Sequence, residues 1–225
     1  MNDKELVALH AARRVEDGML VGLGTGSTAN YFIEELARRQ REEGLKVTAV
    51  SSSVVSAVKA QSLGLPLLAL EQLSRLDLYV DGADEVSPQL ALLKGRGYDL
   101  VREKLLARAS DAFLVLVDGS KLVDRIGEKY PIPVEVMPFA WRLVQRSLQQ
   151  HGGRGELRPN AAKDGLTITS HGSLVLDMHF DAGIDSATLD ALLSATPGVV
   201  EHGIFTGLAH TVYIARDGAV EERRA

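Results

Sequence analysis

Apolar residues in the first half of the chain gather into short runs that are separated by polar, glycine-containing segments. Continuous apolar runs of about five residues, bounded by turn residues, are typical of strands buried on both faces. Such runs occur at Met19–Leu23, Leu65–Leu70, Leu76–Val80 and Phe113–Val117, and a further strand is predicted at Lys46–Val50. We therefore predict five strands before residue 118.

The segments between these runs have the periodicity of amphipathic helices. In the segment Ala29–Arg39, apolar residues occupy positions 29, 32, 33, 36 and 37, which places them on one helical face. Further helices are predicted at Leu6–Val15, at Val54–Leu63 with Gly64 as its end, and from Asp99 as N-cap to about Ala109. Alternating strands and helices indicate an α/β fold, with a parallel sheet covered on both faces.

The pattern changes near Gly127, where the order of elements becomes strand, helix, two strands, helix and strand. This is the order of a ferredoxin-like α+β unit. The strands are predicted at Val134–Met137, Gly155–Arg158 (extended by Leu166–Thr169), Leu174–Phe180 and Val199–Phe205, and the helices at Ala140–Gln150 and Asp185–Ser194.

Two prolines in Tyr130-Pro-Ile-Pro133 suggest that the chain passes from one domain to another there. The last predicted strand, Ala209–Ala215, returns to the first domain. We predict a Rossmann-like catalytic domain of residues 1–128 plus 206–225. Residues 129–205 are predicted to form the ferredoxin-like lid or oligomerisation domain.

Composition narrows the classes of function. The 225 residues include no cysteine, which excludes disulfides, thiolate metal sites and cysteine nucleophiles. The net charge of −5 and the lack of a basic block argue against nucleic acid and anionic membranes as partners. The polar N-terminus has no signal-peptide core, and no apolar run approaches the ~20 residues that span a bilayer. A cytoplasmic protein is expected.

A glycine-rich loop, Gly22-Leu-Gly-Thr-Gly-Ser-Thr28, lies between a predicted strand and a helix N-terminus, with Ser27 or Thr28 as the expected cap. Such a loop presents backbone N–H groups and the positive end of a helix dipole, which suit a phosphate. The glycine spacing is not that of a dinucleotide fingerprint, and no Gly-Lys-Ser/Thr follows as in a P-loop. The alternative is a helix-capping turn that binds no ligand.

Four polar loops follow predicted strands: Thr25–Thr28, Ser51–Ser53, Asp81–Asp84 and Asp118–Lys121. Because the carboxyl ends of parallel strands meet at one edge of a sheet, we expect these loops to converge there. Asp81, Asp84 and Glu85 follow a buried strand, and buried charge is costly unless it is paired. A polar ligand at this edge would explain the acids; an acidic turn facing water is the alternative.

Other candidate residues are two lysines and a helical glutamate. Lys94 and Lys121 are suited to bind an anion. Glu103 shares a helix face with Leu106 and Ala107 and so points inward, unless it is a surface charge paired with Arg102 or Lys104. The histidines show no metal-ligand spacing and are expected at the surface or in turns; they are His10, His151, His171, His179, His202 and His210.

These motifs together resemble the type A ribose-5-phosphate isomerases, which interconvert ribose 5-phosphate and ribulose 5-phosphate. The resemblance runs nearly from end to end. It is carried by Val21–Ala29, Ser51–Ser53, Tyr79–Glu85, Leu93-Lys-Gly95, Arg102-Glu-Lys104, Asp118–Lys121, Pro133-Val-Glu-Val136 and Pro197-Gly-Val-Val200.

The resemblance implies a role for each matching residue. Glu103 is the expected general base, Lys94 the cation near the enediolate oxygen, and Asp81 and Asp84 the acids for ring opening and hydroxyl protons. Lys121 and Lys4 are expected near the phosphate. The expected substrate-binding segments are Thr25-Gly26-Ser27-Thr28, Asp81-Gly82-Ala83-Asp84 and Lys94-Gly95-Arg96-Gly97. No metal or organic cofactor is implied, and the expected assembly is a homodimer or homotetramer.

Two departures from the family pattern lie in the lysine loop. Arg96 replaces a small or apolar residue, and Tyr98-Asp99 replaces small residues, whereas Gly95 and Gly97 remain. The pKa of Glu103 is also undecided, because the helix dipole and Lys94 would lower it while burial would raise it. Two alternatives to the isomerase are a sugar-phosphate sensor and a deaminase of amino-sugar phosphates.

Overall fold

A computed structural model describes residues 2–225 and divides them into two compact units. The first unit contains the residues up to Ala83 together with Arg102–Lys121 and Gly207–Ala225. The second contains Asp84–Val101 and Leu122–Thr206. Residues 84–101 and 122–128, which were predicted to belong to the first domain, therefore cluster with the second unit.

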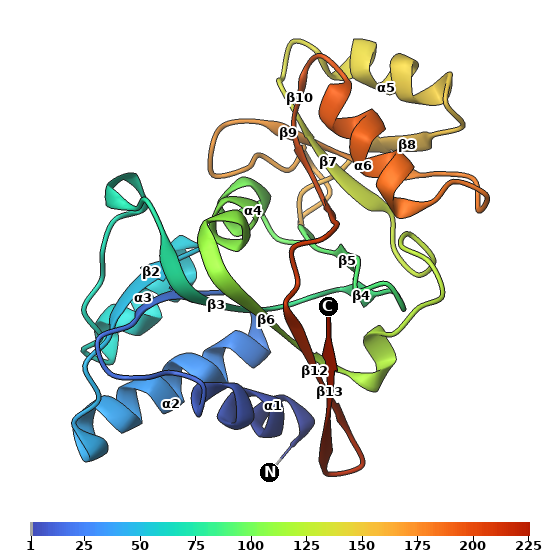
Figure 1. Cartoon of the computed structure of the whole chain (residues 1–225). Helices are drawn as coiled ribbons and strands as arrows, with labels where there is room; N and C mark the ends of the chain where they lie inside the picture. Colours follow the sequence, from blue (N-terminus) through green and yellow to red (C-terminus); the bar gives the residue numbers. More distant parts are fainter. Residues whose placement is uncertain (1) are drawn as a thin grey trace. The chain divides into compact units, whose positions relative to one another are not determined.

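The first unit is built on a six-stranded sheet with the order β13-β12-β6-β3-β1-β2 (Figure 1). All pairings are parallel except that of the terminal hairpin β12–β13. The strands are β1 (Leu20–Leu23), β2 (Thr48–Ser51), β3 (Leu76–Gly82), β6 (Ser110–Asp118), β12 (Thr211–Arg216) and β13 (Ala219–Arg224). The predicted return of the chain in β12 is confirmed, and β13 was not predicted.

Helices cover this sheet: α1 (Asp3–Ala12), α2 (Ser27–Glu43), α3 (Val54–Ser62) and α4 (Leu100–Ala109), with short 3-10 turns at Leu70–Gln72 and Gly119–Lys121. The core between α1, α2 and the sheet contains Phe32, Ile33, Leu78, Val80 and Tyr213, all nearly inaccessible to solvent. Leu78 and Val80 point to this core, so Tyr79 and Asp81 project from the opposite face of β3, because side chains alternate along a strand.

Three local predictions in the first unit were wrong. The helix predicted from Leu6 begins at Asp3, where the Asn2 side chain caps it by accepting a hydrogen bond from the Glu5 N–H. The run Leu65–Leu70 forms only an isolated bridge between Ala49 and Leu67. Neither Ser27 nor Thr28 caps α2, since its N-cap is Gly26, at φ +107°.

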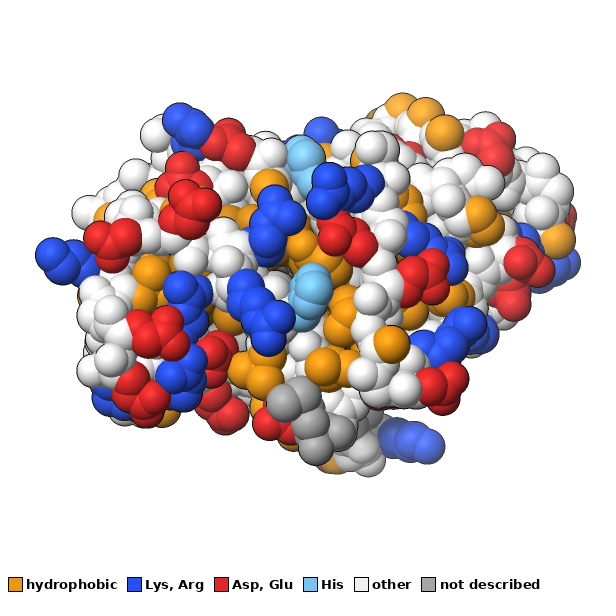
Figure 2. Space-filling model, turned by 60° about the horizontal axis from the view of Figure 1, so that its bottom comes forward, with side chains coloured by type: hydrophobic (Ala, Val, Ile, Leu, Met, Phe, Trp, Pro, Cys, Tyr) orange, Lys and Arg blue, Asp and Glu red, His pale blue; other side chains and the backbone are white. Residues whose placement is uncertain are grey.

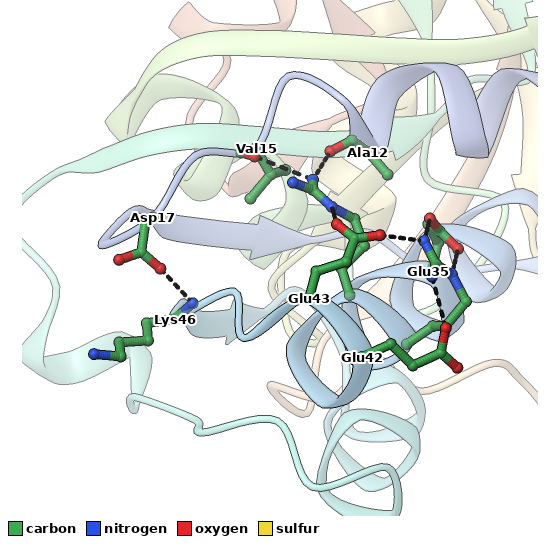
Figure 3. Close-up of polar contacts among 9 residues, drawn as sticks. Ala12, Val15, Asp17, Glu35, Glu42, Glu43 and Lys46 are labelled. Atoms are coloured by element: carbon green, nitrogen blue, oxygen red, sulfur yellow. Dashed lines mark hydrogen bonds and ion pairs between the residues drawn. The ribbon is translucent and has the colours of Figure 1, made fainter.

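An ion-pair network joins the end of α1 to α2 (Figure 3). The Arg39 guanidinium donates to the carbonyls of Ala12 and Val15, at the end of α1, and to the Glu43 carboxylate. Its neighbour Arg38 binds the carboxylates of Glu35, Glu42 and Glu43. These contacts fix the end of α1 against α2.

The second unit contains a four-stranded antiparallel sheet with the order β10-β7-β9-β8. Its elements in chain order are β7 (Ile132–Val136), α5 (Trp141–Gln149), β8 (Arg154–Leu157), β9 (Leu174–His179), α6 (Ser186–Ala195) and β10 (Val199–His202). The predicted order of elements is confirmed, and so is the Asp185 N-cap of α6. The extension at Leu166–Thr169 is wrong, because only isolated bridges form there.

A small three-stranded sheet, β11-β5-β4, completes the second unit and was not predicted. It consists of β4 (Glu85–Val86), β5 (Leu92–Leu93) and β11 (Ile204–Phe205). Gly203 separates β11 from β10, which the sequence analysis had treated as one strand. Strands of two residues have too little periodicity to be recognised in a sequence.

Candidate active site

Asp81 lies at the end of β3 and is the centre of a buried hydrogen-bond network. Its Oδ2 accepts a hydrogen bond of 2.6 Å from the Tyr79 hydroxyl. Its Oδ1 accepts from the backbone N–H groups of Thr25, at 3.0 Å, and Gly82, at 2.8 Å. The carboxylate is 1% exposed, so these donors fix its orientation.

Tyr79 links Asp81 electrostatically to Glu103. Burial raises the pKa of Tyr79 well above its usual value, and the nearby charges of Asp81 and Glu103 raise this pKa further. The phenol therefore keeps its proton at neutral pH and remains a donor to Asp81. Two carboxyl groups from different elements thus act electrostatically on one buried hydroxyl.

Glu103 occupies the first turn of α4 and is 7% exposed. The alternative of a surface charge is therefore wrong, and the inward orientation predicted from the helix face is confirmed. The neighbouring Arg102 donates to the Ser51 carbonyl at 3.4 Å, which places this turn of α4 near the end of β2.

The loop after β1 is held by a cluster of three serines; two of them, Ser52 and Ser53, belong to a predicted polar loop, and Ser56 was not predicted. The Thr25 hydroxyl lies 3.0 Å from the Ser52 hydroxyl, 2.7 Å from that of Ser53 and 3.3 Å from that of Ser56. Ser56 also donates to the Gly24 carbonyl at 2.6 Å. The loops after β1, β2 and β3 therefore meet at one edge of the sheet, as their strand ends predicted.

A surface hollow of about 580 Å³ lies at the N-terminus of α2. Lys4 Nζ donates to the Ser27 hydroxyl at 2.9 Å, and both residues line the hollow together with Asp118, Gly119 and Ser120. A lysine, hydroxyl groups and a helix N-terminus form a suitable site for an anion. Lys121, the next residue along the chain, is not among the lining residues.

Asp118 contributes negative charge to this hollow. Its burial raises its pKa, but hydrogen bonds from Ser120 and the charges of Lys121 and Lys4 outweigh that effect, so the net pKa is lowered. Asp118 is therefore ionised at neutral pH.

Lys94 belongs to the second unit, and the small sheet positions its main chain. Leu93 pairs with Ile204, and the Lys94 N–H donates to the Gly203 carbonyl at 2.9 Å. The side chain is 4% exposed, with Nζ 5.8 Å from the centroid of the Phe205 ring. The face of an aromatic ring at this distance attracts a cation.

Asp84 and Arg96 flank this lysine in sequence. The Asp84 N–H donates to the Leu93 carbonyl at 2.8 Å, and its carboxylate is 3.9 Å from an Arg96 nitrogen. The Arg96 guanidinium lies 4.1 Å from the Tyr130 ring centroid. The departure at Arg96 thus introduces a cation beside Asp84, and aromatic stacking holds it there.

The remaining residues of the predicted substrate-binding segments belong partly to the first unit and partly to the second. Gly26, Thr28, Gly82 and Ala83 lie in the first unit, whereas Gly95 and Gly97 lie in the second. Gly95 has φ +92°, and a Cβ there would lie 2.8 Å from Leu100 Cδ1, so glycine is required on both grounds.

Glu85, the third acid after β3, has a structural role. Its carboxylate is fully buried and accepts hydrogen bonds from the N–H groups of Gly127, Lys129 and Tyr130, at 2.6–2.8 Å. It therefore anchors the segment that leads into β7.

One histidine prediction is corrected. His202 is 1% exposed, with Nε2 3.1 Å from Asp190 Oδ1 and 3.0 Å from the Ser194 hydroxyl, so it is a core residue rather than a surface one.

Among residues 2–225, no cluster of three or more His, Asp or Glu side chains has a geometry that would hold a metal ion. Within the same range, no helix is both long and apolar enough to cross a membrane.

Comparison with known proteins gives the family. The family model described as ribose 5-phosphate isomerase A (phosphoriboisomerase A) matches residues 48–218. A ribose-5-phosphate isomerase A from Synechococcus sp. (strain RCC307) is 46% identical over 213 residues, which cover 94% of this chain and 90% of the relative. The chain belongs to the ribose-5-phosphate isomerase A family. Ribose-5-phosphate isomerase activity, within the pentose phosphate pathway, follows from this membership.

Solved structures of the family share the fold. The ribose 5-phosphate isomerase A of Methanocaldococcus jannaschii has a TM-score of 0.93 and 41% identity, covering 99% of this chain and 98% of its own. A D-ribose-5-phosphate isomerase in complex with phospho-erythronic acid has a TM-score of 0.95 and 37% identity, with complete coverage of both chains. The six-stranded, mostly parallel sheet with smaller antiparallel sheets is therefore the fold of ribose-5-phosphate isomerase A.

Proposed function

We propose that Glu103 is the general base of an aldose–ketose isomerisation between D-ribose 5-phosphate and D-ribulose 5-phosphate. The base removes the C2 proton of the open-chain aldose, an enediolate forms, and the same proton returns to C1. The observation that carries this proposal is the burial of Glu103 at the sheet edge, where its charge and that of Asp81 act on the same Tyr79 hydroxyl. A positioned general base contributes about 10²–10⁴-fold in rate.

The other groups are assigned by charge and position. Asp81, with its orientation fixed by three donors, and Asp84 handle ring opening and the hydroxyl protons. Lys94 stabilises the enediolate oxygen, and stabilisation of this kind is worth roughly 3–4 kcal/mol for one donor. This chemistry requires no metal or organic cofactor.

We propose that the substrate phosphate binds at the N-terminus of α2. Lys4 and Ser27 line the hollow there. Thr25 and Gly26 lie in the adjoining loop, Thr28 lies in the first turn of α2, and Lys121 is close to Asp118. Phospho-erythronic acid carries a carboxylate and a phosphate, as an enediolate intermediate carries an oxyanion and a phosphate. We expect this chain to bind it as well.

The division of the fold into domains is also part of this proposal. The parallel sheet with helices supports a Rossmann-like catalytic domain, and the β7-α5-β8-β9-α6-β10 unit supports a ferredoxin-like domain. We further propose that the second domain serves as a lid or an oligomerisation surface in a homodimer or homotetramer. The mass of the protein in solution tests the assembly.

The substitution Glu103→Gln tests the assignment of the base. It preserves the shape of the side chain but removes the proton acceptor, so kcat is expected to fall by about 10²–10⁴-fold with little change in KM. Ribulose 5-phosphate formation is measured with EDTA present. Glu42→Gln, at an exposed position of α2, is the control. Undiminished turnover in Glu103→Gln, or loss of wild-type activity in EDTA, would contradict the proposal.

A further inference from the structure

Arg158 follows β8 and forms a two-pronged ion pair with Asp177 of the neighbouring strand β9. Its Nε lies 2.9 Å from Asp177 Oδ2, and its Nη2 lies 2.6 Å from Asp177 Oδ1. The two side chains are 13% and 25% exposed. Bidentate pairing of this kind fixes the plane and the position of a guanidinium.

The remaining nitrogen of Arg158 points to the loop that contains Lys94. Nη1 lies 3.2 Å from the Gly95 carbonyl oxygen, 3.3 Å from that of Arg96 and 3.2 Å from that of Gly97. Three consecutive carbonyl dipoles therefore converge on one cationic group. Without a cation between them, these carbonyl oxygens would repel one another, and the curved conformation of the loop would be less stable.

The main chain of Lys94 is held differently on its two sides. On the N-terminal side, β5 pairs with β11, and Gly203 accepts the Lys94 N–H; a Cβ at Gly203 would lie only 2.4 Å from the Lys94 carbonyl oxygen. On the C-terminal side, no strand follows, and the next three carbonyls are bound by Arg158. Arg158 therefore holds the main chain after Lys94, as the pairing of β5 with β11 holds the main chain before it.

We infer that Arg158, oriented by Asp177, is a positioning residue for the reaction: it fixes the turn Gly95–Gly97 and thereby the ammonium group of Lys94. This inference rests on the role proposed for Lys94. Arginine suits the task because its planar, five-donor group binds a carboxylate with one edge and carbonyls with the other nitrogen. A lysine would provide a charge but could not maintain both sets of contacts.

A second arginine–aspartate pair, between β8 and the segment that follows β9, is a control. Arg154 of β8 binds Asp181 at 2.9 Å, with side chains that are 78% and 59% exposed. Its described contacts do not include the Lys94 loop. A purely structural contribution of arginine–aspartate pairs to this sheet would appear at both positions, whereas positioning of Lys94 would appear only at Arg158.

The test compares Arg158→Met and Arg158→Lys with Arg154→Met, using the full chain and ribose 5-phosphate. Misplacement of a catalytic group by about 1 Å costs up to about 10²-fold in rate. We therefore expect kcat to fall roughly 10- to 100-fold in Arg158→Met, less in Arg158→Lys, and not at all in Arg154→Met. Melting temperatures are recorded for all three variants.

Coupling to Lys94 separates positioning from general damage to the fold. In a Lys94→Met background, Arg158→Met is expected to cause little further loss, because residues that act as a unit have non-additive effects. Millimolar guanidinium is expected to restore part of the activity of Arg158→Ala. If the losses in Arg158→Met and Lys94→Met multiply in the double variant, or if Arg158→Met retains wild-type kcat, the inference is overturned.

The variant Lys94→Met also distinguishes a failure of the role proposed for Lys94 from a failure of the role inferred for Arg158. If it retains full activity, the role proposed for Lys94 fails, and the inference fails with it. If it loses activity while Arg158→Met does not, only the inference about Arg158 fails. The inference is also overturned if a lowered melting temperature accounts for the whole loss of activity in Arg158→Met and guanidinium does not restore activity to Arg158→Ala.

Discussion

Asp81 illustrates how a single side chain is prepared for chemistry at the residue scale. Each of its oxygens has a fixed donor, and the Tyr79 phenol keeps its proton because burial and two carboxylates raise its pKa. The carboxylate therefore does not need to reorient when a substrate arrives. Such preorganisation is the main electrostatic advantage of an enzyme site over water.

Glu135, from the Pro133–Val136 motif, is a buried acid that is expected to lower the stability of the folded protein by a measurable amount. Its Oε1 accepts a hydrogen bond of 2.8 Å from Thr169, but its Oε2 has no hydrogen-bond partner among the described residues. Burial raises the pKa of Glu135 above its usual value. The folded protein thus holds this proton more tightly than the unfolded chain, so the stability contribution is lost as the pH rises through the usual and then the raised pKa.

We expect Glu135→Gln to increase the free energy of unfolding at neutral pH by about 1 kcal/mol, because it removes a poorly solvated charge. Below the usual glutamate pKa, the variant and the wild type should be equally stable. Urea unfolding from about pH 4 to about pH 8 checks this, with the exposed Glu71→Gln as control. A variant that is less stable than the wild type at neutral pH would contradict the prediction.

At the scale of elements, the loop after β1 depends on close approach to β3. The Gly24 N–H donates to the Val80 carbonyl at 2.8 Å, and a Cβ at Gly24 would lie 2.1 Å from Asp81 Oδ1. Any larger residue would displace either the loop or the Asp81 carboxylate. The glycine is therefore required by packing and not by its φ angle.

Gly24→Ala is accordingly expected to lower kcat/KM by roughly 10- to 100-fold, since it shifts groups that must be held to about 1 Å. Gly183→Ala is the control, because a Cβ there meets no atom within 4 Å. Steady-state kinetics and a melting curve for each variant test this. Equal kcat/KM for Gly24→Ala and the wild type would show that the contact does not matter.

At the scale of the whole molecule, the chain passes four times between the two units, so each unit is assembled from segments that are distant in sequence. Lys4, Asp81 and Glu103 belong to the first unit, whereas Asp84 and Lys94 belong to the second. Basic and acidic side chains are interspersed on the face drawn in Figure 2. The positive charge proposed for phosphate binding is therefore local, provided by a few placed lysines, rather than a property of the overall charge of −5.

A ligand that binds only the folded protein stabilises it by about 2.7 kcal/mol at a concentration of 100 times Kd. We expect phospho-erythronic acid to raise the melting temperature, and Lys4→Met to reduce this shift at the same ligand concentration. Lys46→Met, at an exposed position that does not line the hollow, should leave the shift unchanged. An equal shift in Lys4→Met and the wild type would exclude Lys4 from the phosphate site.

The sequence by itself determined the order of most elements, the convergence of the loops at the strand ends and the family. These follow from local periodicity and from ordered motifs, which need no knowledge of distant contacts. It did not identify two-residue strands such as β4, or the cap of α2, where the local signals are weak or ambiguous.

The tertiary structure alone decided which side chains are buried together. Burial of Glu103 rather than exposure, the hydrogen bond from Tyr79 to Asp81, and the contact of Arg158 with a loop about 60 residues earlier all depend on packing between distant segments. Glu85 and Asp81 look alike in sequence, yet the first binds backbone amides of residues 127–130 and the second belongs to the candidate site. Local pattern indicates which element forms, whereas the burial and the partner of a polar group are set by which elements pack against it.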